Sequence, residues 1–409
     1  MKTEQSLGSW QRLDEVMVFL FRLHLSLSFR SLPFSTSSAS ASIYTPTFRS
    51  LSNMSKTYAT EEQVAVAAVR RACHLTSRVF NTLVKNETLV KGDKSPVTVG
   101  DFAAQAVIAS ILTHAFPGDP IVGEEDASDL RLPEGKEMKD RIVSLANEAL
   151  TEELALGDNV NWGIGPGAKK TDEELLDAID RGRYEGGGVG RMWTIDPIDG
   201  TKGFLRGEQY AVCLSLIVDS IVQLGVIGCP NLPVDAAHPE KGTGCLFVAV
   251  RGHGAQQLTL SGANPEPLHI PTSASSPENF DFLESVEAAH SSHSFNERVS
   301  SLLGITRPPT RMDSQAKYGC LARGEGGAYL RMPTVVGYRE KIWDHAPGQV
   351  LVEEAGGVVT DSRGEPLTFG HGRTLGENYG IVAAGKEAHA KVLAAVQAVI
   401  KEEKEKAKA

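Results

Sequence analysis

The spacing of apolar residues predicts that the folded part of the chain begins with two helices. A pair resembling a capping box, Thr60 and Gln63, precedes apolar residues that recur every three or four positions. These residues are Val64, Ala67, Ala68, Ala72, Leu75, Val79 and Leu83. A second helix is predicted over residues 102–116, where Pro117-Gly118 ends the pattern. We therefore expect a helical layer near the start of the fold.

Apolar segments that alternate with turn residues follow, and they predict one antiparallel sheet. The run Ile121-Val122-Gly123 is interpreted as a short buried strand that ends in acidic residues. Residues 126–191 are polar and Gly-rich with only short helical patterns, so we interpret them as a cap or insertion. The predicted strands of the sheet are residues 192–195, 211–218, 221–227 and 246–250.

The last part of the chain has a different pattern. After a loop rich in Ser and Pro at residues 262–277, short strands alternate with helices, one over residues 344–355 and the last from Lys386. Such alternation is typical of an α/β unit. The predicted organisation is an N-terminal extension (1–56), an α+β domain (57–270, with the insertion at about 127–190) and an α/β domain (271–409).

Composition and charge exclude several partners. The chain is 41% apolar and 22% charged, as soluble globular proteins are, and its net charge of −10 argues against a nucleic-acid or anionic-membrane partner, because like charges repel. The apolar stretch at residues 16–29 is interrupted by Arg22 and His24 and is too short to span a bilayer. We expect a small-molecule ligand, and no obligatory protein partner is evident.

The N-terminal extension has two interpretations. Between Val16 and Thr60 it contains no Asp or Glu but is rich in Ser and carries spaced basic residues, the composition of a mitochondrial transit peptide. Alternatively, translation begins at Met54, or the extension is a dispensable tail. Five cysteines without metal-site spacing indicate reduced structural thiols. We therefore expect a cytoplasmic protein, with a mitochondrial location as the alternative.

Four separated segments place acidic residues next to predicted strand ends or helix starts. Taken one at a time, each has a structural explanation: Asp101 and Asp344 as helix caps, Glu124 as a solvated loop acid, and Asp196 and Asp199 as turn formers. The segments are SPVTVGD (95–101), GEED (123–126), DPIDGT (196–201) and WDHAPG (343–348).

The DPIDGT segment changes this assessment when all four are considered together. Both carboxylates follow a predicted strand, and the fixed torsion of Pro197 directs Asp199 back toward Asp196. Two anions this close repel each other unless a cation lies between them, and oxygen ligands without nearby His or Cys favour Mg²⁺. Gly200 and Thr201 add close backbone approach and a hydroxyl, and such a turn can hold phosphate oxygens.

The ordered set GEE, DPIDGT and WDxxxG resembles the lithium-sensitive, Mg²⁺-dependent phosphatase superfamily that includes inositol monophosphatase and fructose-1,6-bisphosphatase. The runs SPVTVGDFAAQ, LGVIGCPNLP, DSQAKYG and YREKIWDHAPG resemble, more narrowly, the 3′(2′),5′-bisphosphate nucleotidases of fungi and plants. The resemblance covers about residues 60–400. It implies a layered αβαβα sandwich of α+β and α/β parts. It also implies removal of the 3′-phosphate from adenosine 3′,5′-bisphosphate, in many members also from its sulfated form, in support of sulfate assimilation.

The same resemblance assigns roles to individual positions. It implies two or three Mg²⁺ ions, held by carboxylates and one backbone carbonyl. It further implies that Asp101, with the Thr201 hydroxyl, orients or deprotonates the attacking water. The implied metal ligands are Asp101, Glu124, Asp196, the Ile198 carbonyl, Asp199 and Asp344.

Substrate contacts follow from the resemblance as well. Lys317 and Arg331 are expected to hold the second phosphate, which an inositol monophosphate lacks. The complete implied set is Gly200, Thr201, His290, Ser314, Lys317, Arg331 and Asp344.

Two rival functions remain open at this point. The first is an inositol mono- or polyphosphate phosphatase with the same metal chemistry. DSQAKYG and the combination of Lys317 with Arg331 argue against it. The second is a non-catalytic nucleotide- or ion-sensing protein that kept the fold, although every expected acidic ligand is present.

Overall fold

The computed structural model describes residues 57–85, 95–154, 159–272, 278–287, 292–335 and 337–407. Ser55–Ala409 form one compact unit, which does not include Met1–Met54. The predictions for the N-terminal extension therefore lie outside the described residues.

The first predicted helix is confirmed, and the second is longer than expected. α2 begins at Ser95, not at Phe102, because Pro96 is tolerated in the first turn, where the N–H that it lacks would have no helical partner. Asp101 consequently lies within the helix and is not its cap. Four helices form the first layer: α1 (Ala59–Lys85), α2 (Ser95–Ala115), α3 (Lys136–Thr151) and α4 (Asp172–Asp180).

Helices α3 and α4 come from the segment that the sequence suggested as a cap or insertion. The side chains of Ile142, Leu150, Leu175 and Ile179 are buried in the same apolar core as α1 and α2. The segment is therefore part of the helical layer, because its short amphipathic helices complete that core.

A seven-stranded sheet packs against these helices. Its strands are hydrogen-bonded in chain order, and all pairs are antiparallel except β1 with β2. Along β5, Leu246 and Val248 face the helical layer, whereas Phe247 and Ala249 face the opposite side, as a period of two requires. The strands are β1 (Ile121–Gly123), β2 (Arg191–Asp199), β3 (Ala211–Val218), β4 (Ile221–Pro233), β5 (Thr243–Val250), β6 (Gly254–Thr259) and β7 (Glu266–Leu268).

A five-stranded mixed sheet forms from the last part of the chain, in the order β11-β12-β10-β8-β9. On β12, Val382 and Ala384 face one core, and Ile381 and Ala383 face another. The strands are β8 (Phe282–Glu284), β9 (Thr310–Arg311), β10 (Ala328–Arg331), β11 (Gly357–Thr360) and β12 (Ile381–Gly385).

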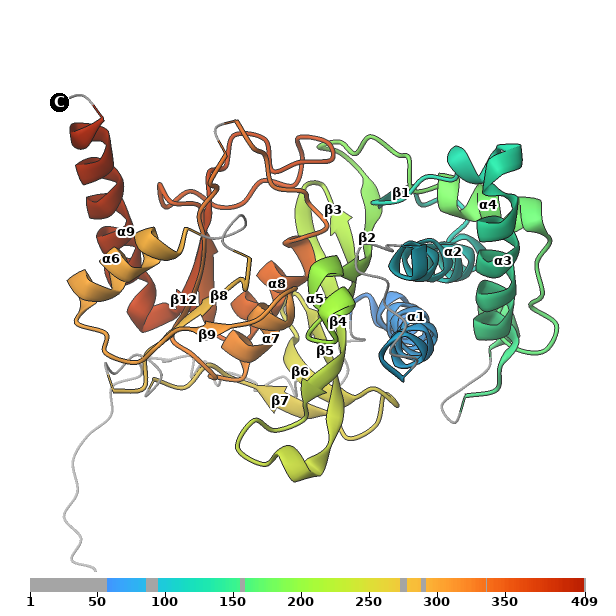
Figure 1. Ribbon diagram of the computed structural model, residues 1–409, viewed down its shortest axis with the longest axis horizontal. Coiled ribbons are helices and arrows are strands. Elements are labelled where there is room, and N and C mark those ends of the chain that lie inside the picture. Colours follow the sequence, from blue (N-terminus) through green and yellow to red (C-terminus); the bar gives the residue numbers. More distant parts are fainter. Residues whose placement is uncertain are drawn as a thin grey trace, which may run out of the picture. The chain divides into compact units, whose positions relative to one another are not determined.

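The remaining helices complete the layers (Figure 1). One apolar core joins α7 and α8 to both sheets, and another joins α6 and α9 to the outer face of the second sheet. The predicted αβαβα sandwich is therefore confirmed. These helices are α5 (Thr201–Arg206), α6 (His293–Leu303), α7 (Ala316–Ala322), α8 (Ala346–Glu354) and α9 (Lys386–Lys406).

The division into two domains near residue 270 stays a prediction. The chain passes from the first sheet to the second between Leu268 and Phe282, but both sheets lie within one compact unit. The shared core around α7 and α8 explains this, because it buries residues of both sheets together.

Two further properties concern the whole described chain. No helix among the described residues is long and apolar enough to cross a bilayer. All five cysteines are buried and free, as expected for structural thiols, and burial raises the pKa of Cys229 and Cys245, the latter to about 11.

The contact between α7 and α8 gives a stability prediction. A Cβ on Gly348 would lie 2.1 Å from the ring of Tyr318, which is fully buried. Gly348→Ala should lower the free energy of unfolding by about 1–2 kcal/mol, because overpacking outweighs the gain in helix propensity. Urea denaturation measures this change. Gly118→Ala is the control, since a Cβ there meets nothing within 4 Å, and equal stability of both variants would contradict the packing argument.

Candidate active site

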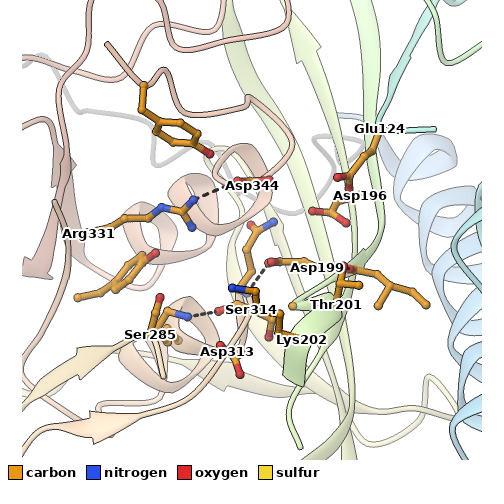
Figure 2. Close-up of a pocket in the computed structure, with 16 residues that line it drawn as sticks. Glu124, Asp196, Asp199, Thr201, Lys202, Ser285, Asp313, Ser314, Arg331 and Asp344 are labelled. Atoms are coloured by element: carbon orange, nitrogen blue, oxygen red, sulfur yellow. Dashed lines mark hydrogen bonds and ion pairs between the residues drawn. The ribbon is translucent and has the colours of Figure 1, made fainter. Parts of the chain in front are cut away.

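A cavity of about 240 Å³ lies where the two sheets and the helices between them meet. Figure 2 shows Glu124 and Asp196 on one side of it and Asp344 and Arg331 on the other. The lining residues are Glu124, Asp196, Ile198, Asp199, Gly200, Thr201, Lys202, Ser285, Asp313, Ser314, Gln315, Lys317, Tyr329, Arg331, Tyr338 and Asp344.

A β-bulge brings Asp196 and Asp199 to the same cavity. Residues three apart on a regular strand point to opposite faces. The register of β2 against β3 shifts between these two residues, so that Asp196 pairs with Cys213 and Asp199 with Ala211. Pro197 lies within the bulge, where the hydrogen bond that it cannot donate is not required. The strand thus continues through Asp199, and the bulge, not the strand's end, directs both carboxylates into the cavity.

The turn after the bulge requires a glycine. Gly200 has a φ of 89°, in the left-handed region. A Cβ at this position would lie 3.1 Å from Cβ of Ser314. Gly200 therefore lets the DPIDGT turn approach the segment that precedes α7.

Glu124 follows β1 directly and is held by its neighbours in the chain. Gly123 pairs in parallel register with Ile195, the residue before Asp196. On the other side, Gln105 of α2 donates to the Glu125 carbonyl (2.7 Å) and accepts from its N–H (3.0 Å). The backbone on both sides of Glu124 is therefore fixed.

Gln315 connects the DPIDGT turn to the segment that carries Asp344. Its backbone N–H donates to Asp199 Oδ2 at 2.6 Å, and its side-chain amide donates to the Trp343 carbonyl at 2.8 Å. Its Oε1 accepts from the N–H of Gly348 at 3.1 Å. One residue before α7 thus fixes two acidic segments that are far apart in the sequence.

The carboxylates of the site are difficult to ionise together. Burial, followed by the charge of Asp344, raises the pKa of Glu124 to about 8 and that of Asp199 to about 7. Burial and the charges of Glu124 and Asp199 also hold the pKa of Asp196 well above its usual range. Burial and the charges of Glu125 and Glu124 raise the pKa of Asp101. A cation among these groups would reverse the shifts.

The donors fit a hard divalent cation. Oδ1 of Asp196 is buried and has no hydrogen-bond partner among the described residues, which leaves a full acceptor directed into the protein. The cavity offers carboxylate oxygens and no sulfur, as Mg²⁺ prefers. These residues therefore fit the metal that the resemblance implies.

A second acidic group, Glu340, Asp344 and His345, also has ligand atoms within 4.8 Å of one another. Glu340 accepts two charge-assisted bonds from Arg331, at 3.0 and 2.8 Å, and lies 3.2 Å from Nε2 of His345. Although burial opposes it, the charge of Arg331 lowers the pKa of Glu340 to about 2. The negative charge of Glu340 is thus balanced by Arg331 within the protein. Asp344 is the member of the group that faces the cavity.

Of the two residues expected to act on water, Thr201 lines the cavity and Asp101 does not. Thr201 lines the cavity, and its hydroxyl donates to the Ile198 carbonyl at 3.4 Å. Asp101 is buried and interacts electrostatically with Glu124, but it is not part of the lining. The catalytic roles of both residues stay predictions.

The expected phosphate-binding residues lie on the side of the second sheet. Lys317 is buried, and its Nζ donates to the carbonyls of Met312 (2.9 Å) and Ser314 (2.8 Å). Burial lowers its pKa to about 8, although Asp199 favours the charged form. Arg331 lies at the end of β10 and also contacts Asp344 at 3.4 Å. His290 lies outside the described residues.

Six lining residues were not predicted from the sequence. Lys202, Asp313, Gln315 and Tyr338 lie within or beside the quoted motifs, so proximity to a motif was the available signal for them, whereas Ser285 and Tyr329 lie in none of these motifs. The six are Lys202, Ser285, Asp313, Gln315, Tyr329 and Tyr338.

Comparisons with known proteins identify similar chains over most of this sequence. Residues 57–401 match the inositol monophosphatase family. Proteins named 3′(2′),5′-bisphosphate nucleotidase are similar to the chain. The one from Schizosaccharomyces pombe is 50% identical over 83% of this chain and 95% of its own length. The one from Emericella nidulans is 46% identical (84% and 99%), and the one from Oryza sativa 41% (86% and 97%).

Solved structures support the fold. An inositol monophosphatase from Zymomonas mobilis has a TM-score of 0.51 at 19% identity and covers 84% of this chain and 100% of its own. One from Thermotoga maritima has the same score and identity, with coverage of 84% and 99%. The solved structures show the fold, and the match over residues 57–401 shows that the chain belongs to the inositol monophosphatase family.

Proposed function

We propose that the chain is a Mg²⁺-dependent 3′(2′),5′-bisphosphate nucleotidase that hydrolyses adenosine 3′,5′-bisphosphate to AMP and phosphate. The observation that carries the proposal is the cavity that combines a cluster of carboxylates, of which Asp196 is buried, with the cations of Lys317, which is buried, and Arg331, which is 13% exposed. The acids suit a metal-assisted phosphoryl transfer, and the cations suit a second phosphate. The similar proteins from Schizosaccharomyces pombe, Emericella nidulans and Oryza sativa are named for this activity.

The carboxylates would hold the metal. Glu124, Asp196, Asp199, Asp344 and the Ile198 carbonyl line the cavity as candidate ligands. Bound Mg²⁺, two or three ions by resemblance, would neutralise phosphoryl charge and make water more acidic. The chain's own contribution is to fix the ligand geometry through the bulge of β2 and the contacts of Gln315.

Two side chains would act on the attacking water. Asp101 is a carboxyl near the ligands, and burial with the charges of Glu125 and Glu124 raises its pKa, which makes its ionised form a stronger base toward the attacking water. The Thr201 hydroxyl, fixed by the Ile198 carbonyl, would orient the water. The reaction does not require a histidine.

Substrate selectivity would depend on the opposite side of the cavity. Lys317 and Ser314 lie at the start of α7, and Arg331 lies at the end of β10. A charged donor in a buried position forms strong hydrogen bonds to phosphate because little water competes. An inositol monophosphate offers no second phosphate for these groups.

The first prediction tests the proposed reaction. With Mg²⁺ present, phosphate release from adenosine 3′,5′-bisphosphate should be at least about tenfold faster, as kcat/KM, than from inositol 1-phosphate, since one charge-assisted contact is worth about 1.5–3 kcal/mol. A colorimetric phosphate assay at matched concentrations measures both rates. Preference for inositol 1-phosphate would favour an inositol phosphate phosphatase, and no phosphate release from either substrate would favour a sensing protein.

The second prediction concerns Asp196 and pH. Acids whose pKa is raised on folding destabilise the fold as pH rises from about 4 through the raised values. These are about 7 for Asp199 and about 8 for Glu124. The metal-free protein should therefore lose stability between pH 5 and pH 8, because the unfolded chain releases protons that these groups keep in the folded chain. Added Mg²⁺ should restore it.

Asp196→Asn should make the metal-free protein more stable at pH 8, abolish activity and largely remove the stabilisation by Mg²⁺. Thermal unfolding with and without Mg²⁺ measures this. Asp140→Asn is the control, because Asp140 is an exposed acid of α3 that pairs with Lys136 at 2.7 Å. If Asp196→Asn kept full activity, the metal assignment would be wrong.

The third prediction concerns the second phosphate. Lys317→Met should lower kcat/KM for adenosine 3′,5′-bisphosphate by about 10- to 150-fold, the equivalent of about 1.5–3 kcal/mol. The rate with adenosine 3′-monophosphate should change little, since it never makes this contact. Arg331→Met should show the same selectivity, although it also loses the pair with Glu340.

Lys202→Met is the matched control for Lys317. Lys202 lines the same cavity, but it is half exposed and already pairs with Glu287 at 3.1 Å. Lys202→Met should lower kcat/KM for adenosine 3′,5′-bisphosphate much less than Lys317→Met does. Equal losses on both substrates in Lys317→Met would mean that this lysine serves folding or the reacting phosphate.

A further inference from the structure

We propose that Arg373 is a positioning residue that fixes Glu124 relative to Asp344 and thereby sets the affinity of the site for divalent cations. This inference rests on the proposed metal-dependent function. Arg373 lies in the segment between β11 and β12, outside every motif that the sequence singled out. It does not line the cavity.

The side chain of Arg373 holds the segment that carries Glu124. Its guanidinium donates to the carbonyl of Gly123, the residue immediately before Glu124, across a sequence separation of 250 residues. It also donates to the carbonyls of Gly182 (2.9 Å) and Tyr184 (3.1 Å). The N–H of Gly123 in turn donates to the Gly182 carbonyl at 2.8 Å. Arg373 therefore binds the end of β1 and the strand-like segment beside it at once.

The backbone around Arg373 holds the segment that carries Asp344. The Arg373 carbonyl accepts from the N–H of Ile342 at 3.2 Å, two residues before Asp344. The neighbouring Leu375 N–H donates to the Glu340 carbonyl at 2.9 Å. These bonds make a short antiparallel bridge between Lys341 and Thr374. The two segments are therefore joined through their backbones.

The guanidinium also packs on the residue next to Asp344. Its central carbon lies 4.9 Å from the centre of the Trp343 ring, a favourable cation–π distance. Trp343 is buried, and its carbonyl accepts the amide of Gln315. One side chain thus contacts the residue before Glu124 and the residue before Asp344.

This connection has an electrostatic reason. Glu124 and Asp344 repel each other, and each raises the free energy of the other's ionised form. Without a brace, the backbone could relax that repulsion by moving the two segments apart in the metal-free protein. The cation would then have to bring the ligands back, which costs affinity. A connection outside the ligand sphere avoids this cost, as do outer partners of metal ligands in general.

The experiment measures cation binding directly by the full chain. The dissociation constant for Mn²⁺ is obtained by electron paramagnetic resonance, and that for Mg²⁺ by calorimetry, without substrate. Arg373→Met keeps an aliphatic stem over Trp343 but loses all three carbonyl contacts, and it should weaken binding by about 10- to 100-fold. Arg373→Lys, which keeps the charge and can reach a carbonyl, should recover part of the affinity.

Arg323→Met is the matched control. Arg323 also donates to two carbonyls, those of Pro233 (2.9 Å) and Val234 (3.1 Å), and lies 5.6 Å from the centre of the Phe247 ring. It joins no segment that carries a proposed ligand. Its loss should lower thermal stability but leave the Mn²⁺ dissociation constant unchanged.

A second variant tests the same brace if Arg373→Met fails to fold. Trp343→Leu removes the ring from the other end, and it should also weaken Mn²⁺ binding. In the double variant, the loss of Mn²⁺ binding free energy should be smaller than the sum of the losses in the two single variants, because both residues act through one contact. Unchanged Mn²⁺ affinity in folded Arg373→Met, or in folded Trp343→Leu, would overturn the inference. Absence of Mn²⁺ and Mg²⁺ binding in the wild-type chain would instead overturn the proposed function.

Discussion

Mutual repulsion among clustered carboxylates, of which Asp196 is buried, governs the arrangement of this protein. Burial and neighbouring charges raise the pKa values of Glu124, Asp196 and Asp199, so the metal-free site stores unfavourable electrostatic energy. A fold can keep such groups together only if the backbone that carries them cannot move apart. The rest of the structure supplies that restraint, and a divalent cation would supply the missing charge.

The restraint comes from contacts between elements far apart in the sequence. The bulge of β2 directs the side chains of Asp196 and Asp199 into the same cavity, and the backbone N–H of Gln315 donates a hydrogen bond that fixes Asp199. Gln315 and Arg373 then attach the Trp343 segment to both acidic segments of the first sheet. Because α7 and α8 lie in one core shared by both sheets, these contacts are supported by close packing.

The two sides of the cavity have complementary chemistry. The acids of the first sheet suit a cation and the reacting phosphate, whereas Lys317 and Arg331 suit a second anion. Arg331 also pairs with Glu340 and contacts Asp344, so it joins the two sides electrostatically. A change in the positive side would therefore alter substrate preference, while a change in the acidic side would alter the reaction itself.

The sequence by itself determined the features that depend on local pattern. The helix from Thr60, the alternating strands and the acidic motifs follow from periodicity and short-range chemistry, and the motifs supported the family and the layered fold. Tertiary structure decided the rest. The bulge at Pro197, the bonds of Gln315 and the contacts of Arg373 with Gly123 and Trp343 all depend on partners outside the local sequence. A single side chain with an ordinary local environment gives no sign in the sequence of which distant backbone it will bind, because that choice is made by packing.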